Sequence, residues 1–309
     1  MSNKLILITT ALAPIIWGSS YLVTTEYLPQ GYPLSLAVLR ALPVGLLLLI
    51  LCRQLPSANW WLKIIILGAL NFSIFWWLLF ISAYRLPGGV AATIGAIQPL
   101  LVLFLARGFL GSKINTYSIT AAISGLFGVA LLLLTAKSAL DQIGLLAGVG
   151  GAVSMALGTV LSKKWLNEDK SNLVSPLTFT AWQLVAGGIL LLPAAAILEP
   201  SLPNLSNENI FGLIYLGLIG AGLTYLLWFR GLAQLSPSAI APLGFLSPVT
   251  AVLLGWIVLD QSLSALQLSV SAIIFFSIWL SQRKPQKVTF NRALAHISKT
   301  FKQQSNTFN

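Results

Sequence analysis

Ten long apolar runs recur along this chain, and they constrain its fold more than any other feature. Each run has 18 to 24 mostly apolar residues and is bounded by short polar segments. The runs lie at 5–25, 34–52, 61–83, 88–106, 115–135, 143–161, 174–197, 210–229, 237–259 and 264–281. A helix needs about 20 residues to cross roughly 30 Å of hydrocarbon, and a backbone in lipid must satisfy its own hydrogen bonds. We therefore expect an all-α integral membrane protein with ten transmembrane helices.

The composition argues against a soluble protein. Hydrophobic residues make up 57% of the chain, charged residues only 8%, and the mean hydropathy is +0.87, whereas a soluble domain carries about 25% charged residues. The net charge is +11, but the basic residues are dispersed between the apolar runs and in the C-terminal tail, without the basic helix or sheet face that nucleic-acid binding needs. We expect membrane lipid, with its anionic head groups, as the partner of these charges, and no nucleic acid.

Few residues in the sequence are suited to bond-making chemistry. Cys52 is the single cysteine and His296 the single histidine, so an internal disulfide and a cysteine or histidine metal site are both excluded. The paired membrane aspartates or histidines of intramembrane proteases are missing as well. The sequence therefore predicts no metal, no cofactor and no enzymatic activity.

The lysines and arginines predict the orientation in the membrane. With the N-terminus in the cytoplasm, fifteen of the eighteen basic residues fall on the cytoplasmic side; only Arg85 and Lys137 lie outside, and Arg40 lies within a helix. An even number of helices returns the C-terminus to the same side. We expect a multi-pass protein of a bacterial inner membrane with both termini cytoplasmic.

The two halves of the sequence resemble each other. A shift of 149 residues overlays 86–105 on 235–254, and it matches glycine with glycine and proline with proline inside the fourth and ninth runs. A shift of 143 residues overlays Pro33 and Gly45 on Pro176 and Gly188. Proline and glycine matches carry weight because each residue sets local backbone geometry.

These overlays divide the chain into a first repeat of five helices at 1–137, a second at 138–282, and a basic cytoplasmic tail at 283–309. Because five is odd, the second repeat enters the membrane from the opposite side. Inverted repeats are characteristic of secondary transporters, although channels can carry them too. The tail is expected either as an interfacial helix or as a disordered solubilising segment.

Pro99 and Pro248 lie in the middle of the fourth and ninth helices, each after a polar residue, Gln98 and Ser247. A proline there frees backbone carbonyls, which need polar neighbours or a cavity. One hypothesis is that these kinks line a central pathway and flex during gating. The alternative is that they are static kinks that serve packing.

Charges within the membrane are costly and usually functional. Arg40, inside the second helix, is a candidate for attracting a carboxylate or phosphate of a substrate; alternatively, it ties helix ends together or extends toward the membrane surface. No acidic residue lies in the middle of a predicted helix. Exchange of a hydrophobic cation for a proton through a membrane carboxylate is therefore not expected, and a neutral, zwitterionic or anionic substrate fits better.

Other candidates for a substrate pathway are neutral polar and aromatic side chains near the middle of the helices. An aromatic cavity with a few hydrogen-bonding groups is typical of small-molecule sites. The alternative is that these residues serve packing or the aromatic belts at the membrane interfaces. The candidates are Trp17, Ser20, Asn71, Trp77, Gln98, Ser154, Tyr225, Trp228 and Ser247.

Several ordered motifs resemble one family. They are Trp17-Gly18-Ser19-Ser20-Tyr21, Leu39-Arg40-Ala41-Leu42-Pro43, Gln98-Pro99-Leu100 and Leu246-Ser247-Pro248-Val249. Together they resemble the EamA-type members of the drug/metabolite transporter superfamily, in particular the PecM-like branch, over residues 5 to 282. The resemblance implies ten helices, a central cavity and export of small metabolites; for the PecM-like branch it implies pigment efflux and regulation of secreted enzymes. Many relatives carry a glutamate after the fourth helix of each repeat, where this chain has Gly111-Ser112 and Asp260.

The leading hypothesis is an exporter that moves small metabolites, such as amino acids, their derivatives or pigment-like compounds, by alternating access. The alternative is a membrane-embedded regulatory or sensor protein without transport, which the basic tail favours. The sequence specifies neither an oligomeric state nor a coupling ion.

Overall fold

The computed structural model describes residues 3–112 apart from 87 and 96, residues 141–169 and 174–260, and scattered positions within 119–131 and 269–276. Every regular element in these residues is a helix. The predicted helices at 115–135 and 264–281 are described only at isolated positions, all of them helical. The predicted basic tail at 283–309 lies outside the described residues.

The remaining eight predicted helices correspond to helical segments of the structure. Those of the first half are α1 (Asn3–Tyr27), α2 (Pro33–Cys52), the short 3₁₀ helix η1 (Ala58–Trp60), α3 (Trp61–Gly68), η2 (Ala69–Ser73), α4 (Ile74–Arg85), α5 (Gly88–Gly95) and α6 (Gln98–Leu110). Those of the second half are α8 (Gln142–Glu168), α9 (Pro176–Leu198), α10 (Asn207–Ile214), η3 (Tyr215–Leu223), α11 (Thr224–Gln234), α12 (Pro237–Ile240), η4 (Ala241–Phe245) and α13 (Leu246–Val258). Within the described part of the chain, seven helical stretches are long and apolar enough to cross a membrane, so the protein is a multi-pass membrane protein.

Two of the predicted helices in each half, the third and fourth and their counterparts, the eighth and ninth, are irregular at corresponding places. A π-helical segment, η2, joins α3 to α4, and a second one, η3, joins α10 to α11. Helix α6 starts anew at Gln98 with Pro99 in its first turn. The 3₁₀ segment η4, which contains Pro242, separates α12 from α13. Proline lacks a backbone N–H and cannot continue an α-helical ladder, which explains the last two interruptions.

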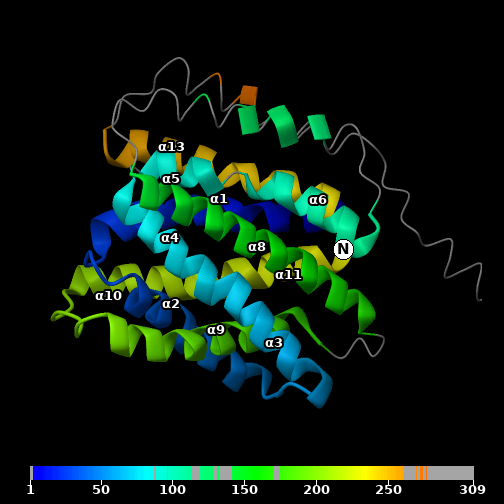
Figure 1. The fold of residues 1–309 in the computed structure, drawn as a ribbon, viewed down its shortest axis with the longest axis horizontal. Helices are drawn as coiled ribbons and strands as arrows, with labels where there is room; N and C mark the ends of the chain where they lie inside the picture. The colour runs from blue at the N-terminus through cyan, green and yellow to red at the C-terminus, as the bar shows by residue number, and fades with distance from the viewer. Residues whose placement is uncertain are drawn as a thin grey trace, which may run out of the picture.

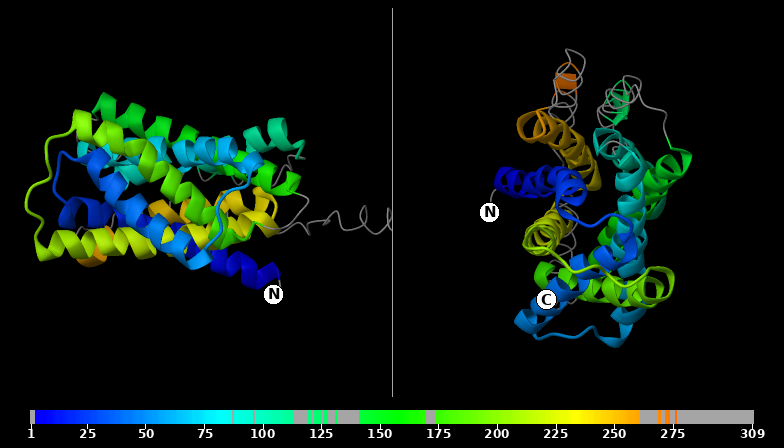
Figure 2. Two further views of the ribbon diagram at one scale, coloured as in Figure 1. Left: turned by 90° about the horizontal axis from the view of Figure 1, so that it is seen from below. Right: turned by 90° about the vertical axis from the view of Figure 1, so that its left-hand side faces the viewer.

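Seen end-on, the helices stand in two groups (Figure 2, right). In one group α1 packs against α11 and α13, and in the other α8 packs against α4 and α6. We call α5–α6 and α12–η4–α13, which are broken near Pro99 and Pro242, the interrupted helices. The two groups touch mainly through them, since α5 contacts α1 and α13 while α6 contacts α12 and η4. A methyl group placed on Gly244 of η4 would lie 3.2 Å from Pro99 Cγ of α6, so the two interruptions face each other closely.

Helices α2 and α9 form the most extensive helix–helix contact and connect both groups along one edge of the bundle (Figure 1). Glycines allow their close approach, as small residues do between membrane helices. A Cβ atom on Gly45 would lie 2.8 Å from the Val185 nitrogen, and one on Gly188 would lie 2.8 Å from Leu42 Cβ. The glycines that overlay at a shift of 143 residues thus meet at one interface.

Polar contacts tie the helices at both ends of the bundle. At one end, the Glu199 end, the Glu199 carboxylate accepts from the backbone N–H groups of Leu34 and Ser35 at 2.6 and 2.8 Å, which places a negative charge at the N-terminus of α2. At the other, the Lys163 end, Lys163 Nζ donates to the carbonyls of Leu232 and Ala233 at 2.7 and 3.0 Å. Lys163 thereby places a positive charge at the C-terminus of α11 and joins the two helix groups.

Candidate functional site

A cavity lies between the two helix groups. The cavity has a volume of about 80 Å³, several times the roughly 10–15 Å³ that a single buried water needs, so it can hold a small organic molecule. Its walls come from α1, α2, α4, α5, α6 and α8 and from α11, α12, η4 and α13. Both interrupted helices therefore border the cavity.

Aromatic rings form one wall. Trp17 of α1 packs against Tyr225 and Trp228 of α11, with ring centres 5.0 and 5.2 Å apart. Trp76 of α4 lies 5.9 Å from Tyr225 in an edge-to-face arrangement. The Trp17 indole N–H donates to Thr224 Oγ1 at 2.9 Å, which fixes that ring. Rigid aromatic walls with few polar groups are the usual form of a small-molecule pocket.

Arg40 is the one charged side chain among the described residues that line the cavity. It is 1% exposed. Its Nη2 donates to Ser20 Oγ at 3.3 Å and to the Gly220 carbonyl at 3.0 Å, and its Cζ lies 4.4 Å from the centre of a Trp76 ring. Within the described residues no carboxylate forms an ion pair with it. The guanidinium is thus held by neutral dipoles and an aromatic face.

Polar atoms without partners gather around this cavity. In the described part of the chain, six buried side-chain nitrogen or oxygen atoms lack a hydrogen-bond partner within the protein. Five of the six belong to residues that line the cavity, and Asn71 Oδ1 is the exception. The five are Arg40 Nε, Arg40 Nη1, Ser82 Oγ, Thr159 Oγ1 and Trp228 Nε1. Buried polar atoms need partners, and in the described part of the chain the atoms that lack one belong mainly to residues that line the cavity.

Nine of the twelve predicted site residues line the cavity. They are Trp17, Ser20, Arg40, Gln98, Pro99, Tyr225, Trp228, Ser247 and Pro248. The other three do not line it. Asn71 is fully buried and donates to Gln183 Oε1 and Ser162 Oγ, Ser154 Oγ donates to the Leu70 carbonyl, and Trp77 is 37% exposed on the outside of the bundle.

The predicted set omits Trp76 and Tyr21, which line the cavity. The internal repeat carries a signal for Trp76, because the 149-residue shift pairs Trp76 with Tyr225 and Trp77 with Leu226. It also pairs Leu79 with Trp228, and both of those residues line the cavity. Tyr21 carries no comparable signal in the sequence.

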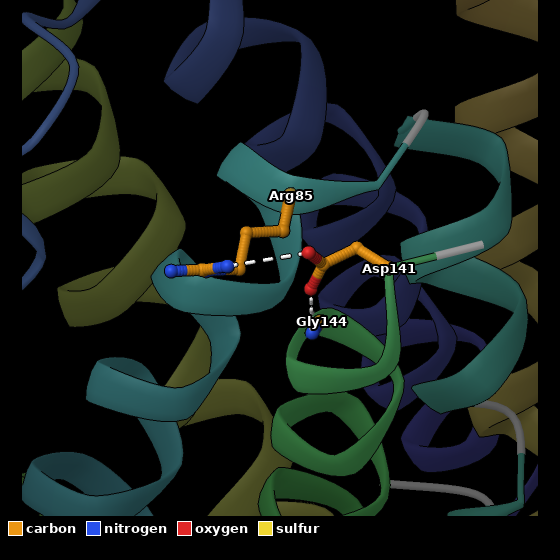
Figure 3. A network of polar contacts seen from close by, with 3 residues as sticks. All are labelled: Arg85, Asp141 and Gly144. Carbon is orange, nitrogen blue, oxygen red and sulfur yellow. Dashed lines mark hydrogen bonds and ion pairs between the residues drawn. The ribbon is translucent and has the colours of Figure 1, made fainter. Parts of the chain in front are cut away.

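Arg85, Asp141 and Gly144 form a polar cluster (Figure 3), and none of the three lines the cavity. Asp141 caps the N-terminus of α8 by accepting from the Gly144 N–H at 2.7 Å, and it pairs with Arg85 of α4 at 3.2 Å. The Gly144 hydrogen bond, assisted by the Arg85 charge, holds the pKa of Asp141 below its ordinary value. This cluster fastens α4 to α8 within one helix group.

Comparisons with known proteins agree with this architecture. The profile of the EamA-like transporter family matches twice, over residues 4–134 and 142–282. Protein PecM of Dickeya dadantii is 43% identical over 271 residues, covering 87% of this chain and 90% of the relative. A chloroplastic WAT1-related protein of Arabidopsis thaliana is 29% identical, covering 88% of this chain and 68% of the relative. A solved crystal structure superposes with a TM-score of 0.74 at 19% identity, covering 91% of this chain and 96% of that one, and so shares its fold.

Proposed function

The chain belongs to the EamA-like transporter family, and from this premise we propose that it exports small metabolites across a bacterial inner membrane by alternating access. Membership makes it a membrane transporter of small molecules. The direction of transport and the substrates, which we take to be amino acids, their derivatives or pigment-like compounds, are part of the proposal.

The observation that carries the proposal is the cavity between two helix groups of mixed origin. With repeats at 1–137 and 138–282, one group combines α1 of the first repeat with α11 and α13 of the second. The other group combines α8 of the second repeat with α4 and α6 of the first. Two similar groups that pivot on the α2–α9 contact would expose the cavity first to one side and then to the other, as expected for inverted repeats.

The interrupted helices are the proposed gates. They supply most of the contacts between the groups, and Pro99 and Pro248 both border the cavity. A helix break absorbs a change of backbone angles at little cost because its hydrogen bonds are already disrupted. Closing and opening at either end therefore needs no rupture of regular helix.

The orientation and the ten-helix count belong to the same proposal. We place the Glu199 end outside and the Lys163 end, with both termini, in the cytoplasm, following the distribution of basic residues. Two family matches of similar length support a duplicated five-helix unit.

Efflux from proteoliposomes that contain only this protein tests the proposal. The liposomes are loaded with labelled amino acids, their acid derivatives and pigment precursors, and the release of each is compared with that from protein-free liposomes. We expect release of at least one class well above the protein-free rate. Release at the protein-free rate for every class would contradict a transport function.

A further inference from the structure

The partnerless atoms around the cavity are mainly hydrogen-bond donors. A guanidinium has five N–H donors; Nη2 uses its two on Ser20 and Gly220, while Nε and Nη1 of Arg40 have no acceptor. The Trp228 indole N–H, which can only donate, also has none. The other two partnerless atoms are hydroxyls of Ser82 and Thr159, which can donate or accept. A ligand that satisfies this set must be rich in acceptors.

The charge of the cavity points the same way. Its described lining contains one guanidinium and no carboxylate, lysine or histidine. An unpaired buried charge is costly, so a ligand that brings one negative charge gains the most from this site. A phosphate carrying two charges would leave one uncompensated, whereas a carboxylate matches a single guanidinium in charge and in fork geometry.

The Arg40 guanidinium makes a cation–π contact with Trp76, since its Cζ lies 4.4 Å from the centre of a Trp76 ring. This contact uses none of the N–H donors, so Nε and Nη1 still need an acceptor. Beside this group, Trp17, Tyr225 and Trp228 offer apolar surface to the remainder of a ligand.

We propose that the cavity binds organic monoanions, with a carboxylate on Arg40 and an apolar or aromatic body against Trp17, Tyr225 and Trp228. The inference rests on the proposed transport function and narrows its substrates to acids that lack a compensating ammonium group. An α-amino acid brings an ammonium, for which the described lining offers no carboxylate.

Three related probes separate these ligand classes: 3-phenylpropionate, its neutral amide 3-phenylpropanamide, and L-phenylalanine, which adds an ammonium to the first. Isothermal titration of the full-length protein in detergent should give 3-phenylpropionate the lowest Kd, at least tenfold below the other two. Equal or tighter binding of the amide or of phenylalanine, or no measurable binding of 3-phenylpropionate, would overturn the proposal.

Substitutions locate the anion. Arg40→Gln should raise the Kd of 3-phenylpropionate at least tenfold and leave that of the amide within about threefold, because only the acid uses the charge. The matched control is Arg85→Gln, which removes an arginine paired with Asp141 outside the cavity and should leave both Kd values unchanged.

If Arg40→Gln does not fold, Trp228→Phe keeps an aromatic ring but removes the N–H, and it should weaken binding of the acid severalfold. An unaltered acid-to-amide ratio in the folded variants would place the anion elsewhere.

Efflux of the same probes from proteoliposomes distinguishes this inference from the transport function. The quantity compared is the release of each probe in excess of its release from protein-free liposomes. A larger excess for phenylalanine or the amide than for the acid would overturn the ligand class and leave transport intact. Tight binding of the acid with release at the protein-free rate would overturn transport and leave the ligand class intact.

Discussion

At the scale of single residues, buried polar side chains in this bundle fall into two kinds. Asn71 binds Gln183 and Ser162 on neighbouring helices, and Ser154 binds the Leu70 carbonyl. Arg40 and Trp228, in contrast, leave donors without partners beside the cavity. Asn71 also keeps one partnerless atom, Oδ1, but it does not line the cavity, so the two kinds differ in where their unused polar atoms lie.

Asp141 gives a pH-dependent prediction at this scale. Its pKa is lowered in the folded protein, so its charge stabilises the fold above the ordinary aspartate pKa and this contribution is lost as the pH falls through the lowered value. Asn is an equally good N-cap residue, which makes Asp141→Asn a test of the charge alone. We expect wild-type protein to have the higher Tm at pH 7 and the two melting curves to converge at acidic pH. Equal Tm values at pH 7, or a Tm difference that does not shrink as the pH falls through the lowered pKa of Asp141, would contradict the stabilising role.

Nine of the twelve candidate residues from the sequence line the cavity, whereas Trp77 of α4 does not. Trp76 and Trp77 are adjacent tryptophans, yet only Trp76 borders the cavity and Trp77 lies on the outer surface. Hydropathy does not distinguish them, because lipid-facing and core-facing sides of a membrane helix are equally apolar. A polar group in the middle of a helix makes Asn71 a pathway candidate, but its Nδ2 donates to Gln183 Oε1 at 2.7 Å and the residue does not line the cavity.

At the scale of elements, the close approach of helices α2 and α9 depends on one glycine from each helix, Gly45 facing Val185 and Gly188 facing Leu42. An added methyl on Gly45 meets backbone at 2.8 Å, and backbone cannot move aside as a flexible side chain can. The positions of the eight described helices follow from apolar length, whereas the π-helical segments η2 and η3 leave no mark in the hydropathy. In η2, Ser73 Oγ donates to the Gly187 carbonyl of α9 at 2.8 Å, a tertiary contact that hydropathy does not reveal.

We predict that Gly45→Ala and Gly188→Ala each destabilise the protein by about 1–3 kcal/mol, since overpacking forces adjoining helices apart. Gly108→Ala in α6 is the matched control, because nothing lies within 4 Å of the added methyl. It should be neutral or stabilise by up to about 1 kcal/mol through the better helix propensity of alanine. Thermal unfolding in one detergent compares the three, and equal Tm values for all three variants would refute the close-contact role of the α2–α9 glycines.

At the scale of the whole molecule, two groups of helices border the cavity described above, and polar contacts join helices at both ends of the bundle. The family, the multi-pass helical fold and the membrane location all follow from apolar runs and ordered motifs in the sequence. The composition of each group does not follow from them, because adjacency between α1 and α11 or between α8 and α4 depends on tertiary packing.

The proposed orientation is tested with two exposed loops at opposite ends of the bundle. Ser201 follows α9 at the Glu199 end, and Ser57 precedes η1 at the other end. In a Cys52→Ser background, Ser201→Cys should react with a membrane-impermeant maleimide in intact cells, and Ser57→Cys should react only after permeabilisation. The reversed pattern would invert the molecule in the membrane.

Blocking the cavity tests most directly whether it is the transport path. Ser247 is partly exposed and lines the cavity beside Pro248, so Ser247→Cys in a Cys52→Ser background places one reactive thiol there, with Ser57→Cys as the control outside the cavity. We predict that reaction with a bulky maleimide lowers proteoliposome efflux at least tenfold for the cavity cysteine and leaves the Ser57→Cys protein unaffected. Unchanged efflux after complete modification of the cavity cysteine would contradict a transport path through this cavity.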